Sequence, residues 1–216
     1  MINYTAARHN MVLSQLEPNR VTDPAILAAM GAVPRERFVP APLAGVAYVD
    51  EDVEIAAGRY LMEPRVLGRL LQEARVQPRE AVLDIGGGTG YSAAVLARLA
   101  NTVVALEEDA DLAARASQTL ASLAVDAAVV TGPLSAGRAD QGPYDVILLN
   151  GSVPEVPKAL LEQLADGGRL LAVVGQLPAC RAMLFVRRGD RVVSRVLFDA
   201  SLPSLPGFAA PRGFVF

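Results

Sequence analysis

Apolar residues in the middle of the chain fall into short runs separated by segments with helical spacing. The run 81–85 is apolar apart from one aspartate and stops at glycines, as a buried parallel strand does. Similar patterns predict strands at 102–106, 127–130, 145–149 and 169–174, and helices at 91–100, 109–123 and 157–164. This alternation predicts a doubly wound α/β fold, with a mostly parallel sheet and helices on both faces.

The two ends of the chain have different patterns. At the N-terminal end, Thr22-Asp23-Pro24 predicts a helix start, with Gly31 as a left-handed cap, and the prolines of 33–42 exclude a long helix. Near the C-terminus, segments 181–187 and 192–198 flank Gly189-Asp190, which suits a type II′ hairpin. From Ser201 the chain reads as a packed, irregular extension.

These patterns divide one domain into three regions. Residues 1–57 are expected to form an N-terminal helical region, and residues 58–176 an α/β core. Residues 177–216 supply a hairpin and tail that complete the same domain. Within the core, Asp166-Gly167-Gly168 is expected to mark the end of the helix 157–164.

Composition excludes several classes of protein. The chain has 216 residues, 52% of them hydrophobic and 20% charged, which suits one folded domain. A net charge of −3 leaves no basic excess for nucleic acid. Without a run of about 18 apolar residues no membrane span is expected, and the polar start of the chain does not resemble a signal peptide. A cytoplasmic location is the default expectation.

Two residue types that often carry chemistry occur once each. With Cys180 as its one cysteine, the chain can form no intrachain disulfide and no cysteine-based zinc site, and we expect no metal. His9 is the one histidine, which argues against Cys-His and Ser-His catalysis. His9 could reach a cleft from the first helix, although a lone histidine is usually structural.

The clearest binding signal is the loop Gly86-Gly87-Gly88-Thr89-Gly90, between the strand 81–85 and the helix that follows. Such a loop presents backbone N–H groups and the positive end of a helix dipole, and glycine lets a ligand approach the backbone. Glu107 ends the next strand, where its carboxylate can accept hydrogen bonds from both hydroxyls of a ribose. Its neighbour Glu108 could share that role.

The loop departs from the dinucleotide-binding pattern, which needs glycine or alanine where this chain has Tyr91. Residues 83–90, with Asp84 before the glycines, instead resemble the first motif of S-adenosylmethionine-dependent methyltransferases. A C-terminal antiparallel hairpin also favours that fold, which carries a reversed strand. NAD binding and a tight turn without ligand remain the alternatives. We expect Tyr91 to pack either on the cofactor or in the helix–sheet interface. We expect Asn150 to end a strand, either as a ligand contact or as a turn residue.

Further motifs resemble those of protein-L-isoaspartate O-methyltransferases over roughly residues 8–175. They are Arg8-His9-Asn10-Met11-Val12, Gln15-Leu16, Val21-Thr22-Asp23-Pro24, the stretch 33–40, Ala47-Tyr48-Val49-Asp50, the stretch 90–97, Pro154-Glu155-Val156-Pro157 and Gly167-Gly168. The resemblance implies a seven-stranded sheet, S-adenosylmethionine as cofactor, and methylation of isoaspartyl carboxylates in damaged proteins or peptides. A carboxylate is already ionised at neutral pH, so such an enzyme needs no base and chiefly aligns the reacting atoms.

Two stretches depart from the family pattern. Where the family carries Gly-Gln-Thr-Ile-Ser-Gln-Pro, this chain has residues 58–64, with Tyr60 and Met62 in place of the threonine and the active-site serine. Methionine cannot donate a hydrogen bond. The family's Gly-Asp-Gly after the third strand is Gly132-Pro133-Leu134 here, so the contacts to adenine are expected to differ.

Two hypotheses follow. In the first, the chain still methylates a protein carboxylate, with Arg59 or Tyr60 holding that group; arginine can bind a carboxylate through two parallel hydrogen bonds. In the second, the chain is an S-adenosylmethionine-binding homologue with another substrate or without methyl transfer, and acts through binding. Tyr60 and Met62 favour the second hypothesis, and the N-terminal motifs favour the first. The sequence does not determine the oligomeric state.

Overall fold

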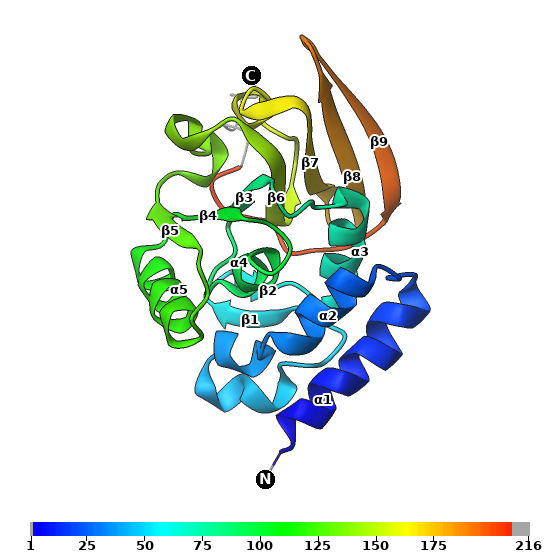
Figure 1. The fold of residues 1–216 in the computed structure, drawn as a ribbon, viewed down its shortest axis with the longest axis vertical. Helices are drawn as coiled ribbons and strands as arrows, with labels where there is room; N and C mark the ends of the chain where they lie inside the picture. The colour runs from blue at the N-terminus through cyan, green and yellow to red at the C-terminus, as the bar shows by residue number, and fades with distance from the viewer. Residues whose placement is uncertain (1, 209–216) are drawn as a thin grey trace, which may run out of the picture.

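The computed structural model describes residues 2–208, which fold around one seven-stranded sheet (Figure 1). The strand order is β5-β4-β3-β6-β7-β8-β9, and neighbouring strands are parallel from β5 to β7. The strands are β3 (Ala81–Ile85), β4 (Thr102–Glu107), β5 (Ala128–Thr131), β6 (Tyr144–Val153), β7 (Leu164–Gln176), β8 (Ala179–Arg188) and β9 (Arg191–Asp199). The predicted mostly parallel, seven-stranded fold is confirmed.

Strands β8 and β9 form the predicted antiparallel hairpin. Arg188 pairs with Arg191, which leaves the two-residue loop Gly189-Asp190 between the strands. Gly189 has a φ of 59°, while Asp190 is not among the residues with positive φ. A positive φ at the first central position alone is the pattern of a type II′ turn, as expected.

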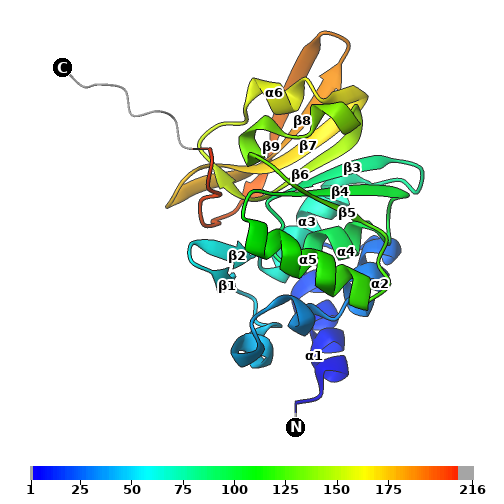
Figure 2. The same ribbon diagram turned by 90° about the vertical axis from the view of Figure 1, so that its left-hand side faces the viewer.

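Helices cover the sheet on both faces, one face much more heavily than the other (Figure 2). One face carries α3 (Pro64–Ala74), α4 (Tyr91–Leu96), α5 (Ala110–Ser122) and the N-terminal helices. The other carries the short α6 (Lys158–Leu161) and a 3-10 turn, η5 (Leu134–Ala136). Alternate strand residues divide between the two cores: Val82 and Val146 face the first, Leu83 and Ile147 the second.

The N-terminal region is built from short helices, as predicted. They are α1 (Tyr4–Met11), a π-helical turn η1 (Val12–Leu16), the 3-10 turn η2 (Glu17–Asn19), α2 (Pro24–Ala32), and the 3-10 helices η3 (Arg35–Phe38) and η4 (Ala41–Val46). The Asp23 side chain caps α2 by accepting a hydrogen bond from the Ala25 N–H, 2.8 Å away.

The expectation that Gly31 ends α2 is wrong, because the helix runs on to Ala32 and Gly31 has no positive φ. A proline disfavours the helical conformation for the residue before it. Val33 precedes Pro34, has an extended backbone, and therefore ends the helix. A Cβ on Gly31 would lie 3.5 Å from Val12, an ordinary van der Waals distance, so Gly31 is on the side of α2 that packs on η1.

Two predicted helices are longer than the observed ones. Helix α4 ends at Leu96, and the chain tightens into turns before β4, with the Leu99 N–H donating to the Leu96 carbonyl. Helix α6 is only four residues long. Asp166-Gly167-Gly168 therefore does not end a helix: it lies inside β7, where the pairing with β6 jumps from Leu164 to Arg169.

A small hairpin absent from the predictions connects the N-terminal region to the core. Strands β1 (Val53–Ala56) and β2 (Arg59–Leu61) pair antiparallel, and the expected boundary between 57 and 58 falls in the turn that joins them. Helix α3 follows and was also not predicted. Along the described residues 2–208, no helix is both long and apolar enough to cross a membrane.

The start of the C-terminal tail packs on the sheet. Leu202, Leu205 and Phe208 are buried. We call residues 202–208 the C-terminal strap; it is the red segment near the β1–β2 hairpin in Figure 2. The expected packed extension is confirmed for residues 201–208, and residues 209–216 lie outside the described residues.

Candidate functional site

The glycine loop lies where β3 gives way to α4, beside the carboxyl ends of β4 and β6. Gly90 caps α4 with a φ of 94°, and Gly86 has a φ of 70°, backbone conformations that favour glycine. The Gly86 N–H donates to the Leu106 carbonyl, which joins the loop to β4. This is the crevice at the carboxyl edge of a parallel sheet where α/β proteins bind ligands.

Asp84 lies in β3, two residues before the glycine loop, and is fully buried. Its carboxylate accepts hydrogen bonds from Ser92 Oγ, 2.6 Å away, and from Asn150 Nδ2, 2.7 Å away. Burial raises the pKa of Asp84 to about 6, although these two donors lower it. Asp84 and Asn150, both predicted cofactor contacts, are therefore brought together. The expectation that Asn150 ends its strand is wrong, because β6 continues to Val153.

Glu107 ends β4 at the loop, as predicted, and is 2% exposed. Gly88 N–H donates to its Oε2 over 3.0 Å, and the N–H groups of Glu108 and Asp109 donate to Oε1 over 2.9 and 3.1 Å. The carboxylate expected to hold a ribose is therefore oriented by three backbone donors at the edge of the glycine loop.

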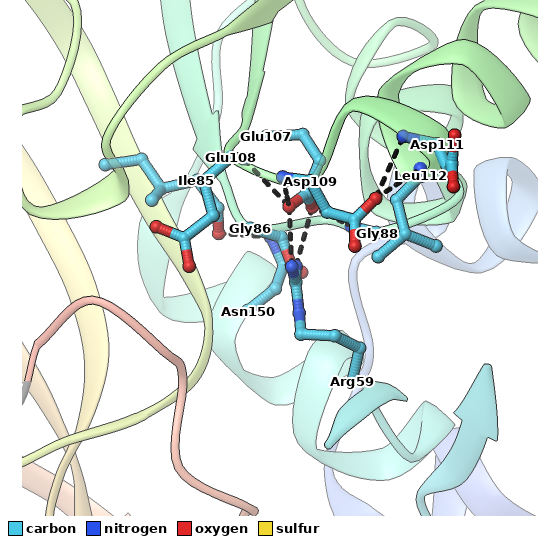
Figure 3. Close-up of polar contacts among 10 residues, drawn as sticks. All are labelled: Arg59, Ile85, Gly86, Gly88, Glu107, Glu108, Asp109, Asp111, Leu112 and Asn150. Atoms are coloured by element: carbon cyan, nitrogen blue, oxygen red, sulfur yellow. Dashed lines mark hydrogen bonds and ion pairs between the residues drawn. The ribbon is translucent and has the colours of Figure 1, made fainter. Parts of the chain in front are cut away.

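Arg59 from β2 also binds this carboxylate (Figure 3). Its Nη1 lies 2.5 Å from Glu107 Oε1 and its Nη2 lies 2.6 Å from Oε2, so the two groups pair through parallel hydrogen bonds. Nη2 also donates to the Gly86 carbonyl over 3.0 Å. Arg59, one of two residues expected to hold a substrate carboxylate, thus holds the carboxylate of Glu107 in the same chain. Arg59 is only 6% exposed.

Tyr91 is buried at the interface between α4 and the N-terminal region. The Arg35 guanidinium lies 4.8 Å from the centre of its ring, and the Phe38 ring meets it edge-on with centroids 5.5 Å apart. Burial raises the pKa of the Tyr91 hydroxyl. The expected alternatives for Tyr91 were the cofactor and the helix–sheet interface; the structure instead packs it between α4 and the N-terminal turn η3.

Tyr60 and Met62 line one cavity together with Arg59, Asn150 and Asp52. Asp52 was not predicted from the sequence. Burial raises the pKa of its carboxyl to about 6, and its Oδ1 accepts a hydrogen bond from the Glu63 N–H over 2.8 Å. The two residues at the family's threonine and serine positions are therefore next to the predicted cofactor contacts, with an acidic group beside them.

The C-terminal strap forms the other wall of this cavity. Its Leu205 side chain packs against the loop so closely that a Cβ on Gly86 would lie 2.7 Å from Leu205 Cδ1 and 3.3 Å from Leu134 Cδ1. Pro133 precedes the turn η5, and Leu134, the first residue of that turn, is fully buried. On the outer side, Glu108 approaches Gly207, where an added Cβ would lie 2.9 Å from Oε2.

The space left between these walls is small. The cavity has a volume of about 10 Å³, roughly what one water molecule needs, whereas sites for ligands of drug size have about 300–1,000 Å³. Both oxygens of Glu107 are engaged by Arg59, and so is the Gly86 carbonyl. In this conformation the residues present do not fit S-adenosylmethionine, although the loop and Glu107 that would hold its nucleoside are in place.

Other candidates lie away from this site. His9 is exposed on α1 and lines a separate groove with Thr5 and Leu27. Cys180 is buried in β8. Among residues 2–208, no group of three or more histidine, cysteine, aspartate or glutamate side chains is arranged to hold a metal.

The sequence interpretation missed Arg35 and Leu205. Arg35 belongs to the stretch 33–40, but its charged neighbours Glu36 and Arg37 gave no local sign that it is buried. Nothing local marks Leu205 as a residue of the site.

Two solved structures resemble this one. A protein-L-isoaspartate O-methyltransferase structure aligns with a TM-score of 0.80 and 24% identity, covering 93% of this chain and 67% of that one. A protein-L-isoaspartate O-methyltransferase from Plasmodium falciparum, in complex with S-adenosyl-L-homocysteine, aligns with a TM-score of 0.79 and 19% identity, covering 96% and 100%. At these identities the likeness establishes the shared fold.

Sequence comparison establishes the family. Protein-L-isoaspartate O-methyltransferase from Koribacter versatilis (strain Ellin345) is 38% identical over 200 residues, which are 92% of this chain and 90% of that protein. The protein of the same name from Methylorubrum populi is 39% identical over 207 residues, 95% and 98% of the two chains. A model of the protein-L-isoaspartate(D-aspartate) O-methyltransferase family matches residues 7–200. The chain therefore belongs to the protein-L-isoaspartate(D-aspartate) O-methyltransferase family.

Proposed function

We propose that this chain is an S-adenosylmethionine-dependent methyltransferase that esterifies an isoaspartyl carboxylate in a protein or peptide. The observation that carries the proposal is the position of Glu107 in a chain of this family. Its carboxylate lies at the carboxyl end of β4, 3.0 Å from the Gly88 N–H. A carboxylate at this position can accept both hydroxyls of a ribose, and glycines let a nucleoside approach the backbone where no other side chain covers it.

The acceptor would enter the cavity beside Tyr60 and Met62. The Tyr60 hydroxyl is a hydrogen-bond donor that could hold the substrate carboxylate, a task for which Met62 has no donor. Asp52 lies on the same cavity, and a second carboxylate beside it would be repelled unless Asp52 is protonated. We therefore expect the acceptor to bind better near pH 5 than near pH 8.

The test of this function combines labelled S-adenosylmethionine with an isoaspartyl peptide, and uses the same peptide with a normal aspartyl residue as the control. Methyl ester on the isoaspartyl peptide alone supports the proposal. The absence of ester on both peptides, from protein that binds S-adenosylhomocysteine in a calorimeter, would reject methyl transfer to isoaspartyl groups while keeping the cofactor site.

A second candidate function is binding without methyl transfer to this acceptor. The replacement of the family's threonine and serine by Tyr60 and Met62, both at the cavity, favours it. The double variant Tyr60→Thr with Met62→Ser restores both hydroxyls. If only these groups are missing, the variant gains ester formation on the isoaspartyl peptide. If the wild type already forms ester at a similar rate, this second candidate fails.

The proposed partner is a protein or peptide with an isoaspartyl or other carboxylate. Nucleic acid is not an expected partner, given the net charge of −3. A cytoplasmic location remains part of the proposal and can be checked by fractionating cells that express the chain.

A further inference from the structure

The nucleoside site of this chain is filled by its own residues, and Arg59 is the central one. The guanidinium lies between Glu107 and the Gly86 carbonyl and donates to both over 2.5–3.0 Å. Figure 3 shows it reaching from the β1–β2 hairpin to the edge of the glycine loop. It is 6% exposed, so the contact is removed from water.

These contacts use the groups that a ribose would need. Glu107 already accepts three backbone N–H groups and two guanidinium N–H groups, which fill the hydrogen-bonding positions of a carboxylate. A ribose hydroxyl can therefore bind Glu107 only after Arg59 leaves. The backbone donors belong to the glycine loop and to the residues next to Glu107 in the chain, whereas Arg59 reaches the carboxylate from the separate strand β2. Arg59 can therefore leave without a change in the backbone around Glu107.

The C-terminal strap closes the site from the opposite side. It pairs with the end of β6: the Ser152 N–H donates to the Pro203 carbonyl over 2.9 Å, and the Leu205 N–H donates to the Ser152 carbonyl over 2.8 Å. These bonds hold the Leu205 side chain against Gly86 and Gly151. The strap and Arg59 line the same cavity of about 10 Å³.

We propose that Arg59 is an internal competitor for the nucleoside, and that the ligand enters only when Arg59 releases Glu107 and the strap moves away from Gly86. The proposal rests on the proposed function for the identity of the ligand. Apparent affinity falls in proportion to the fraction of molecules in the open form, so this side chain determines how strongly the cofactor binds.

The test is calorimetric titration of the full chain with S-adenosylhomocysteine. Arg59→Gln removes the positive charge and one of the two parallel hydrogen bonds to Glu107, while keeping a polar side chain. We expect it to bind the ligand at least 10-fold more tightly than the wild type. Arg65→Gln is the matched control, because Arg65 is a half-buried arginine nearby that pairs with Glu63 instead of Glu107. The affinity of this variant should stay within twofold of the wild type. Equal affinities of wild type and Arg59→Gln would overturn the proposal.

Hydrogen exchange examines the strap separately. Bound S-adenosylhomocysteine should speed exchange of the Leu205 and Ser152 amides, because the ligand separates the strap from β6. If the ligand binds while both amides keep their protection, the part of the proposal that concerns the strap is wrong.

A ligand-free measurement separates this proposal from the proposed function. If neither wild type nor Arg59→Gln binds the ligand, the proposed cofactor is wrong, but the internal pair can still be examined. The variants Arg59→Gln, Glu107→Gln and their combination are unfolded in urea. Less than additive shifts of the midpoint support the buried pair in solution, and additive shifts overturn it.

Discussion

The guanidinium of Arg35 lies 4.8 Å above the ring of Tyr91 and joins the N-terminal region to helix α4 of the core. Its Nε donates to the Ala47 carbonyl and its Nη2 to the Met62 carbonyl, each over 2.6 Å. Burial lowers the pKa of Arg35. One fully buried cation therefore fixes the backbone of Met62, which lines the candidate site, relative to α4.

Replacing this arginine should loosen the site as well as destabilise the fold. Arg35→Met leaves two buried carbonyls without donors, at about 1–3 kcal/mol each, so we expect a loss of roughly 3 kcal/mol in the free energy of unfolding. Arg37→Met, in the same turn but exposed, should change it by less than about 0.5 kcal/mol. Urea unfolding measures both. Equal stability of the two variants would contradict this role for Arg35.

The buried pair of Arg59 and Glu107 should respond asymmetrically to substitution. Glu107→Ala leaves the guanidinium buried and unpaired, which costs about 3–5 kcal/mol. Arg59→Met should cost less, because Glu107 keeps three backbone N–H donors. For comparison, Glu73→Ala removes the exposed ion pair with Arg195 and should cost about 0.2–1 kcal/mol. A larger loss for Arg59→Met than for Glu107→Ala would show that the guanidinium, and not the carboxylate, is the better-held partner.

The raised pKa of Asp84 predicts a pH dependence with a definite sign. In the folded protein this pKa is about 6, above the ordinary value of 3.8, so the folded state holds the proton more tightly. The stability that this group contributes is complete below about pH 4 and is lost as the pH rises through about 6. A pKa shift of this size corresponds to roughly 3 kcal/mol in the free energy of unfolding.

Asp84→Asn removes that titration and keeps the size of the side chain. We therefore expect the stability of the wild type relative to Asp84→Asn to fall between pH 4 and pH 6, as measured by urea unfolding at each pH. The stability of the wild type relative to Asp52→Asn should also fall over this pH range, since burial raises the pKa of Asp52 to about 6. A relative stability that rises over this range would mean that the folded protein prefers ionised Asp84.

The adjacent glycines of β7 should tolerate substitution very differently. A Cβ on Gly168 would lie 2.8 Å from the Tyr144 carbonyl oxygen and 2.9 Å from that of Ala165, so backbone must move. Gly167 has a φ of 78° but no atom within 4 Å of such a Cβ. We expect Gly167→Ala to cost about 1 kcal/mol through backbone strain and Gly168→Ala about 3 kcal/mol through overpacking. The reverse order of stability in thermal unfolding would contradict these roles of Gly167 and Gly168.

Prediction from the sequence succeeded where neighbours along the chain decide the structure. The strand 81–85 and the glycines after it were found because an apolar run and backbone freedom are local properties. Helix α5 was found for the same reason, since the Asp109 side chain caps it by accepting from the Asp111 and Leu112 N–H groups. At Gly31 a stronger local signal, the residue before Pro34, ends the helix one position later. At Gly167-Gly168 the pairing of β7 with β6 overrides the glycine signal, and the predicted helix end does not exist.

The candidate site was predictable only in part. The sequence by itself determined the glycine loop and the carboxylate of Glu107 at its edge, because consecutive parallel strands must end on the same side of a sheet. Only the tertiary structure decided that Arg59 pairs with Glu107 and that Leu205 covers Gly86. These residues are separated by tens of positions in the chain, and their contacts depend on how a hairpin and a tail pack on the finished sheet. Charge and hydrophobicity in a sequence do not specify that packing.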